Sequence, residues 1–294
     1  MKIFSNYHTT FSDGASVSAF ALTRVYLGYE YKFSKNFSTK VNLDVANPGS
    51  GSLEMTAYVK NAYLRYTADR LSVYFGLIPT TQFKLQEKVW GYRYIEKSFQ
   101  DASRFNASAD LGVSFDYQLT DFLSADLIIA NGEGYKKLQS DSTVRTGIGL
   151  TFQPSDRFTG RVYYDFSSRE STLSSVATFI GYSEDRFSIG VEYNKQMNHD
   201  FNDGHDLDGT SVYTTLKISE KIKLMARYDH LESNTLPETS SGWNLSKDGE
   251  MYLAGIEFSP VKGIKIAPNY QGWNPAANNQ PCSSTFILNC EIKF

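Results

Sequence analysis

The chain has almost no cysteine, and the two that it has do not form a recognisable pattern. Cys282 and Cys290 are the only cysteines among 294 residues, and their spacing matches neither a metal site nor a disulfide framework. If the segment between them is extended, they lie about 27 Å apart at roughly 3.4 Å per residue, which exceeds the reach of a disulfide. We therefore expect two free thiols, no metal site and no cofactor.

Long apolar runs are absent as well. No segment approaches the roughly 20 apolar residues that a membrane-spanning helix requires, which excludes a helical membrane protein. The first residues also lack the apolar stretch of about 7 to 15 residues that a signal peptide needs, and they alternate like a strand. We expect that the numbering begins on a processed chain from which a signal peptide has already been removed.

Neither sign of charge dominates. The chain has 29 basic and 32 acidic residues, which are spread evenly and give a net charge of -3. Without a basic stripe there is no surface that would hold a phosphate backbone, so nucleic acid is not expected as a partner.

What the chain has in abundance is aromatic residues. Twenty Tyr and twenty Phe bring the aromatic share to 15%, yet the hydrophobic fraction is an ordinary 41%. This combination is typical of a transmembrane β-barrel, in which apolar residues facing lipid alternate with polar residues facing the lumen. A soluble all-β protein, either a sandwich or a propeller, remains the alternative.

The C-terminal segment 284–294 shows the alternation most clearly. Phe286, Leu288, Cys290, Ile292 and Phe294 share one face, and the residues between them are mostly polar. An alternating strand that ends on an aromatic residue is typical of the last strand of a transmembrane barrel. We expect the strand 2–9 to pair with it, because closure leaves no free edge.

The same alternation predicts sixteen strands in all, or fourteen if two weak ones, such as the first and the tenth, are not strands. Tight turns alternate with connections of variable length, as they do in outer-membrane barrels, where periplasmic turns are short. The predicted strands are 2–9, 18–33, 37–45, 53–66, 71–77, 108–119, 123–129, 144–152, 158–166, 176–182, 187–193, 212–218, 222–228, two strands around 260–263, and 284–294. Aromatic residues gather beside the tight turns, like the girdle at a membrane interface.

The longest stretch without alternation is 80–109, which interleaves charges with aromatic residues. Irregular segments of this length are usually functional. We expect its charged residues to constrict the pore: Lys84, Glu87, Lys88, Arg93, Glu96 and Arg104. An external loop that packs on a neighbouring subunit is the alternative for this segment.

Strand parity also predicts which charged residues line the lumen. Their signs are mixed, which favours weak ion selectivity, and their alternative role is that of solvated salt bridges. The predicted pore-lining residues are Arg24, Lys40, Asp44, Arg65, Asp116, Asp126, Arg145, Arg161, Asp165, Glu192, Arg227 and Asp229.

Catalysis is not expected. A hydrolase built on a barrel needs a nucleophile activated by an oriented histidine, whereas His8, His199, His205 and His230 fall in loops or at predicted strand ends. The acidic loop 200–208 lacks the closing glutamate and the ligand positions of a calcium-binding EF-hand, so we expect a solvated acidic loop there.

The chain resembles the outer-membrane porins of Bacteroidota related to the phosphate-selective porins O and P. Strand signatures in matching order carry the resemblance, at 26–33, 61–66, 72–79, 93–99, 110–113, 130–132 and 264–270. The resemblance implies a sixteen-stranded diffusion barrel, commonly trimeric, whose third external loop folds into the lumen. Phosphate selectivity does not follow, because the predicted lumen charges are balanced.

Two hypotheses about function follow. The first is a porin of the bacterial outer membrane, one barrel domain spanning 1–294 with both termini in the periplasm, through which small hydrophilic solutes or ions diffuse. Its partners would be the lipid bilayer, those solutes and two further copies in a homotrimer. The second is a barrel that acts mainly as a structural or accessory subunit of a larger outer-membrane assembly.

Overall fold

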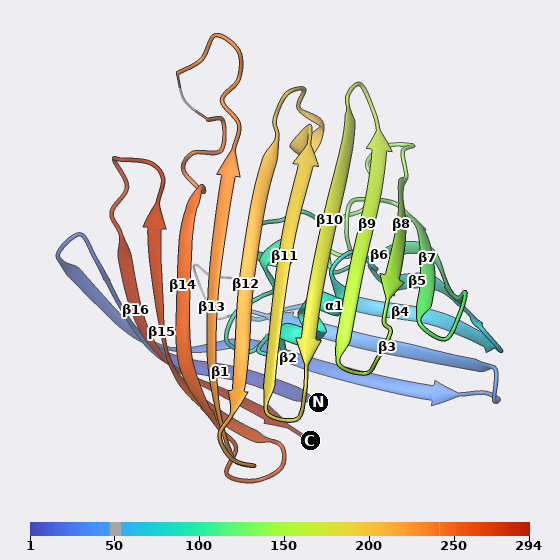
Figure 1. Ribbon diagram of the computed structural model, residues 1–294, viewed down its shortest axis with the longest axis horizontal. Helices are drawn as coiled ribbons and strands as arrows, with labels where there is room; N and C mark the ends of the chain where they lie inside the picture. Colours follow the sequence, from blue (N-terminus) through green and yellow to red (C-terminus); the bar gives the residue numbers. More distant parts are fainter. Residues whose placement is uncertain (48–53, 241) are drawn as a thin grey trace.

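The computed structural model describes residues 1–47, 54–240 and 242–294, and its sixteen strands form one closed antiparallel barrel in which each strand pairs with its neighbours in sequence (Figure 1). The prediction of sixteen strands is confirmed, and the alternative of fourteen is wrong. The strands are β1 (Lys2–Ser12), β2 (Ala15–Lys32), β3 (Phe37–Ala46), β4 (Thr56–Ala68), β5 (Leu71–Pro79), β6 (Ala109–Gln118), β7 (Leu123–Ala130), β8 (Arg145–Phe152), β9 (Phe158–Ser168), β10 (Thr172–Ser183), β11 (Phe187–Met197), β12 (Leu207–Lys217), β13 (Ile222–Ser233), β14 (Gly249–Phe258), β15 (Ile264–Pro275) and β16 (Ser283–Lys293).

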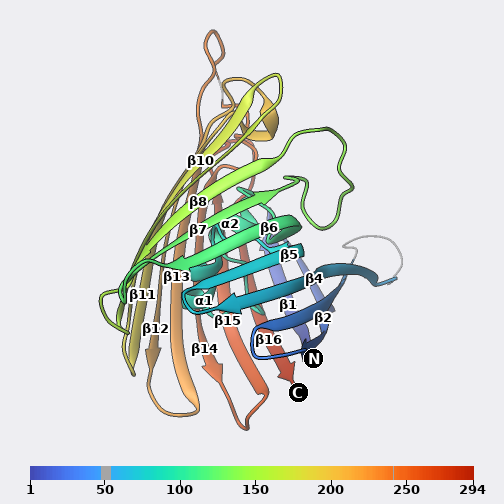
Figure 2. The same ribbon diagram turned by 90° about the vertical axis from the view of Figure 1, so that its right-hand side faces the viewer.

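The barrel closes between its first and last strands, as predicted. The register of β1 and β16 runs without interruption from Lys2 opposite Lys293 to Ser12 opposite Ser283. The N-terminal ammonium of Met1 donates a hydrogen bond of 2.8 Å to the carbonyl oxygen of Phe294, and the two termini lie close together (Figure 2). Pairing of the chain ends removes the open edge that would otherwise bind other strands.

A ladder of alternating charges reinforces this seam across five neighbouring strands. Its four contacts measure 3.9, 3.8, 3.0 and 3.6 Å between nitrogen and oxygen atoms. They link, in order, Lys2 on β1, Glu291 on β16, Lys265 on β15, Glu257 on β14 and Lys223 on β13. Each carboxylate therefore lies between two cations from the strands on either side.

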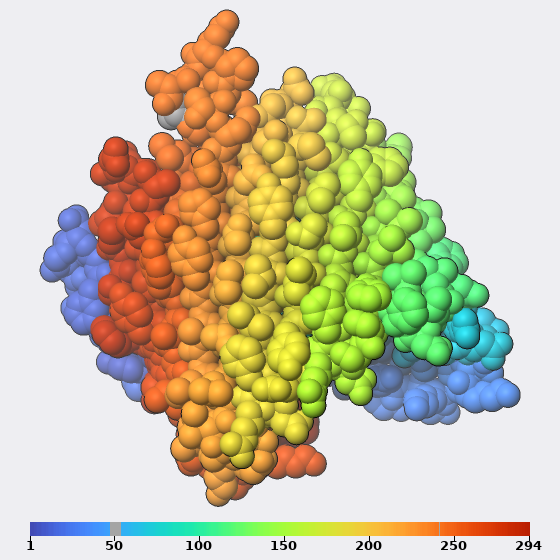
Figure 3. All heavy atoms as spheres, in the orientation of Figure 1, coloured from blue at the N-terminus to red at the C-terminus, as the bar shows by residue number. Residues whose placement is uncertain are grey.

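The two faces of the sheet differ as the alternation predicted. On β16, Phe286 and Leu288 are exposed on the outer face, whereas Asn289 and Glu291 are buried on the inner face. Figure 3 shows the outer face over β9 to β14 as a closely packed surface. The two cysteines are free, with Cys282 exposed and Cys290 half-buried, as expected.

Some local predictions were wrong. The predicted loop between the first two strands is a tight turn at Asp13 and Gly14, whose φ angles of 51° and 73° fit the hairpin turn that Asp-Gly favours. A register shift in the pairing of β1 with β2 and another between β3 and β4 also interrupt the period of two that parity assumed. The predicted loop 47–52 and the predicted strand start at residue 53 lie largely outside the described residues.

The segment 80–108, expected to be irregular, contains two short helices. They are α1 (Lys84–Trp90) and α2 (Phe99–Ala102), and Gly91 ends α1 in the left-handed conformation with a φ of 71°. A third short helix, η1 (His199–Phe201), follows β11. Within the described ranges, no helix is long and apolar enough to cross a membrane.

The closure of the barrel can be tested by covalent capture. Ser5 lies opposite Cys290 in the register of β1 and β16, and directly paired Cβ atoms lie about 4.5 to 5.5 Å apart. This separation is close to what a disulfide spans, so we expect Ser5→Cys to form a bond with Cys290 under mild oxidation. Digestion and mass spectrometry would detect the joined N- and C-terminal peptides.

Two controls define this test. Thr9→Cys should not react with Cys290, because its register partner is Phe286. Ser5→Cys in a Cys290→Ser background should yield no joined peptide. Failure of Ser5→Cys to cross-link in the folded protein would contradict the register of the seam.

Candidate functional site

The inner face of the barrel carries four arginine–aspartate pairs, in which all eight residues belong to the set predicted to line the pore. Arg24 binds Asp44 at 3.0 Å, and Arg161 binds Asp126 at 2.6 and 3.0 Å. Two contacts of 3.0 and 2.9 Å join Arg145 to Asp165, and Arg227 donates to Asp229 at 2.8 and 2.6 Å. The carboxylates of Asp44 and Asp165 are completely buried. Because each of these charges has a partner of opposite sign, the pairs offset the cost of burying charge on the inner face of the barrel.

The other four residues predicted to line the pore differ from one another in their burial and in their contacts. Glu192 is 1% exposed and accepts hydrogen bonds from Gln100 at 2.9 Å and Asn194 at 3.1 Å. Arg65 lies 5.3 Å from the ring centre of Tyr74. Lys40 and Asp116 are half-buried, and each lines a cavity described below.

The backbone of the segment 80–108 accepts hydrogen bonds from side chains of widely separated strands. Tyr213 on β12 donates to the carbonyl of Gln86 at 3.1 Å, and Asn289 on β16 donates to that of Tyr94 at 3.1 Å. Three of the paired arginines do the same: Arg161 binds the carbonyl of Thr81, Arg145 that of Phe105, and Arg227 that of Lys97. Each of these three arginines therefore binds both an aspartate of the inner face and the backbone of the segment 80–108.

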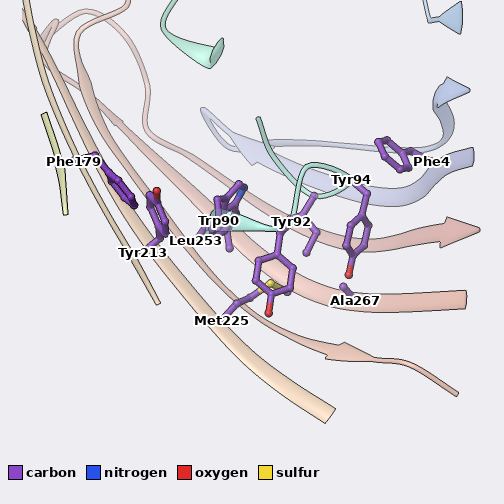
Figure 4. Close-up of a cluster of buried hydrophobic side chains, with 10 residues drawn as sticks. Phe4, Trp90, Tyr92, Tyr94, Phe179, Tyr213, Met225, Leu253 and Ala267 are labelled. Atoms are coloured by element: carbon purple, nitrogen blue, oxygen red, sulfur yellow. The ribbon is translucent and has the colours of Figure 1, made fainter. Parts of the chain in front are cut away.

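Aromatic side chains of the segment form its main apolar contact (Figure 4). Trp90, Tyr92 and Tyr94 are at most 4% exposed, and they cluster with apolar side chains of the wall. The wall side of the cluster comprises Phe4, Phe179, Tyr213, Met225, Leu253 and Ala267. The rings of Trp90 and Tyr213 meet edge to face at 5.6 Å between centres, and Arg227 lies 4.9 Å from the Trp90 ring centre.

A polar contact completes this cluster. Tyr94 donates a hydrogen bond of 2.9 Å to Glu257, which is 1% exposed. Burial, followed by the neighbouring carboxylate of Glu257, raises the pKa of Tyr94, so its hydroxyl remains protonated and able to donate. Burial likewise raises the pKa of Tyr92 to about 12.

The six residues predicted to constrict the pore do not form one cluster. Lys84, Lys88 and Arg104 are exposed, whereas Glu87, Arg93 and Glu96 are half-buried. Arg93 lies 3.8 Å from Glu87 and 3.3 Å from Asp101, so its guanidinium is held between two carboxylates of its own segment. The backbone carbonyl of Glu96 accepts a hydrogen bond of 2.9 Å from the indole of Trp90.

Two cavities meet at Arg93. A loop-side cavity of about 660 Å³ is lined by Arg24, Arg104, Arg145 and parts of the connections 132–137 and 199–201. A turn-side cavity of about 450 Å³ lies next to the chain ends and is lined by Lys2, Lys40, Lys60 and Glu87. Arg93 lines both cavities, so their boundary lies at its side chain.

A third cavity lies apart from this boundary. This side cavity of about 640 Å³ is lined by Asp69, Lys84, Asp116, Asp126 and Arg161, among others. Among the described residues, it shares no lining residue with the loop-side or the turn-side cavity.

Reasoning from strand parity missed two features of this site. Lys60 faces inward because the register shift between β3 and β4 interrupts the alternation beside it, and no sequence signal marks that shift. The apolar inner residues Phe179, Tyr213, Met225 and Leu253 were also missed. Here a signal existed: apolar residues occur at inward positions of strands β10, β12, β13 and β14, where solvated side chains would be polar.

No protein-family model and no curated protein sequence matches the chain. Solved structures do match. The outer membrane channel DcaP of Acinetobacter baumannii is 13% identical over 100% of this chain and 96% of its own, with a TM-score of 0.71. An anion-selective porin from Comamonas acidovorans is 9% identical over 100% and 98%, with a TM-score of 0.70.

A third similar structure is the trimer form of in-vitro folded OmpT, an outer membrane protein of Vibrio cholerae. It is 14% identical over 100% of this chain and 98% of its own, with a TM-score of 0.61. At such identities the likeness concerns the fold: this chain shares the closed barrel of these outer-membrane proteins.

Proposed function

We propose that the protein is a porin of the bacterial outer membrane that lets small hydrophilic solutes or ions diffuse through its lumen. The observation that carries this proposal is the division of one closed sheet into an exposed aromatic outer face and a charged inner face. The aromatic outer face is compatible with contact to lipid, and the charged inner face is compatible with contact to water. The proposed unit is the whole chain, 1–294, as a single barrel domain.

The segment 80–109 is proposed to fold into the lumen and narrow it. Its support is the set of hydrogen bonds from inner side chains of β8, β9, β12, β13 and β16 to the backbone of this segment. On this proposal, the charge of Arg93 lies beside the narrowest part of the passage, and Arg24 and Lys40 line the same cavities as Arg93.

The proposed setting is the outer membrane of a member of the Bacteroidota, with both termini in the periplasm. The termini are adjacent and lie at the end where every connection between strands is short, which supports this orientation. Assembly as a homotrimer is proposed because a similar barrel, OmpT of Vibrio cholerae, has a trimer form.

We propose no catalytic role. Three of the four histidines have neighbours that account for them: His8 hydrogen-bonds Asn6, and His205 stacks on Trp243 at 4.5 Å between ring centres. His199 hydrogen-bonds Gln196 and stacks on the same indole. His8 and His230 lie inside β1 and β13, whereas they were expected at a strand end or in a loop.

Conductance in planar bilayers tests the proposal. The purified barrel is expected to form discrete channels in KCl, and reversal potentials in a salt gradient would give the ratio of cation to anion permeability. Bilayers that remain sealed at protein concentrations where insertion is verified would contradict a diffusion channel. Stoichiometric co-purification with other membrane proteins would then favour the role of an assembly subunit.

A further inference from the structure

Three tyrosines and two lysines gather where the loop-side and turn-side cavities meet. This ring–lysine cluster consists of Tyr26, Tyr58, Lys60, Tyr135 and Lys136. Tyr135 and Lys136 line the loop-side cavity, whereas Tyr26 and Lys60 line the turn-side cavity. Arg93, which lines both, belongs to the same boundary. A solute that moved from one cavity to the other would pass these side chains.

Neither lysine of the cluster forms an ion pair within the part of the chain that the structure describes. No carboxylate oxygen of the described residues lies within 4.0 Å of the ammonium group of Lys60 or Lys136. They contact rings instead. Lys60 lies 5.5 Å from the ring centre of Tyr26 and 5.8 Å from that of Tyr135, and Lys136 lies 4.5 Å from that of Tyr58.

Three carboxylates near the boundary already have partners. Asp44 is completely buried between Arg24 at 3.0 Å and the hydroxyl of Tyr135 at 2.8 Å. Asp101 and Glu87 contact Arg93. Burial and, to a smaller extent, the nearby charge of Arg24 lower the pKa of Lys136, whereas the carboxylates of Asp44 and Asp101 act in the opposite direction.

Contacts with neighbouring side chains fix the orientation of the Tyr58 and Tyr135 rings. The hydrogen bond from Tyr135 to Asp44 fixes the Tyr135 ring, and Tyr58 meets it edge to face with centres 6.3 Å apart and planes at 88°. A further aromatic ring can add to such a group by the same edge-to-face contact. An aliphatic anion would gain only attraction to the ammonium groups, which water and salt screen within about 8 to 10 Å.

We propose that the ring–lysine cluster is a binding site for small aromatic carboxylates. The carboxylate lies between Lys60 and Lys136, and the ring packs against Tyr26 and Tyr135. This inference rests on the proposed porin function, because it assigns a class of solute to the passage. Occupancy at the boundary of the two cavities would obstruct the flow of other ions.

The test uses the full-length barrel in detergent micelles and then in planar bilayers, with benzoate as the probe and acetate and phosphate as comparisons. Saturation-transfer NMR in micelles measures binding without requiring conduction. In bilayers, benzoate should reduce the KCl current at concentrations about 3- to 10-fold lower than acetate or phosphate, the range expected for one added aromatic contact.

Variants separate the contributions of charge and ring. Lys60→Met should weaken benzoate binding at least about 5-fold, since it removes one of two ammonium groups. Tyr135→Leu should bring benzoate to the level of acetate. Lys137→Met is the matched control, because Lys137 is exposed and makes no contact with a ring of the cluster, and it should leave binding unchanged.

Each result has a definite consequence. Equal block by benzoate and acetate, stronger binding of phosphate, or unchanged binding in Lys60→Met would overturn the proposed site. Bilayers without channels together with NMR binding of benzoate that depends on Lys60 would overturn the porin function and leave the binding site supported.

Discussion

Replacing Arg227 by methionine is expected to destabilise the protein by about 3 to 5 kcal/mol, since it leaves a buried carboxylate without its partner. The Arg227 side chain is completely buried, and Asp229 is 10% exposed. Arg227 donates three hydrogen bonds to Asp229 and one to the backbone carbonyl of Lys97, while its guanidinium lies over Trp90. The substitution therefore removes contacts within the wall and contacts that hold the segment 80–108.

Unfolding in urea, followed by tryptophan fluorescence of the barrel in lipid vesicles, measures this loss. Trp90 reports on the segment because its indole is 1% exposed beside Arg227. The double variant Arg227→Met with Asp229→Leu should recover most of the stability, because no unpaired charge remains. A cost of about 1 kcal/mol should persist, since Ser211 loses its hydrogen bond of 2.6 Å to Asp229.

Arg186→Met provides the matched control. Arg186 is exposed between β10 and β11, and a substitution at such a position usually changes stability by less than about 0.5 kcal/mol. If Arg227→Met were as mild as Arg186→Met, the pair would not support the fold in the way that its burial indicates.

The second large effect is expected on conductance. Replacing Trp90, Tyr92 and Tyr94 by serine removes three buried rings, each of which contributes about 1.5 to 3 kcal/mol of apolar burial. The segment 80–108 should then leave the inner wall and fluctuate. If it narrows the lumen as proposed, mean single-channel conductance should rise about two-fold, with added current noise, because ion flow scales with the open cross-section.

Tyr94→Phe is the control for this triple variant. It keeps the ring and removes only the hydrogen bond to Glu257, so conductance should stay close to that of the unchanged protein. Unchanged mean conductance and noise in the triple variant, with folding verified by heat-modifiable mobility, would contradict a narrowing role for the segment.

The alternation of residues was sufficient to predict most of the wall. It gave sixteen strands and the pairing of β1 with β16, because a strand with one apolar face tolerates only one register. It also selected the arginines and aspartates that pair on the inner face. It failed at Asp13 and Gly14, where the pair Asp-Gly itself favours a tight turn that alternation does not detect.

Other features could not be predicted from a period of two. The inward position of Lys60 follows from a register shift, which depends on how two strands fit together in three dimensions. Alternation also did not predict which of the inner charges bind one another. Arg161 could have paired with any inward aspartate, and only the closed sheet places it 2.6 Å from Asp126 on β7 rather than beside Asp165.

The closed barrel and its two faces follow from the order of residues alone, because alternation is a local property and every strand repeats it. The set of side chains at the boundary of the two cavities depends instead on how the strands are arranged in three dimensions. Tyr26, Tyr58 and Tyr135 belong to three different parts of the chain. Lys60 contacts the rings of Tyr26 and Tyr135 because of the register shift between β3 and β4. Contacts between residues this far apart depend on strand tilt, stagger and closure, which no local pattern encodes.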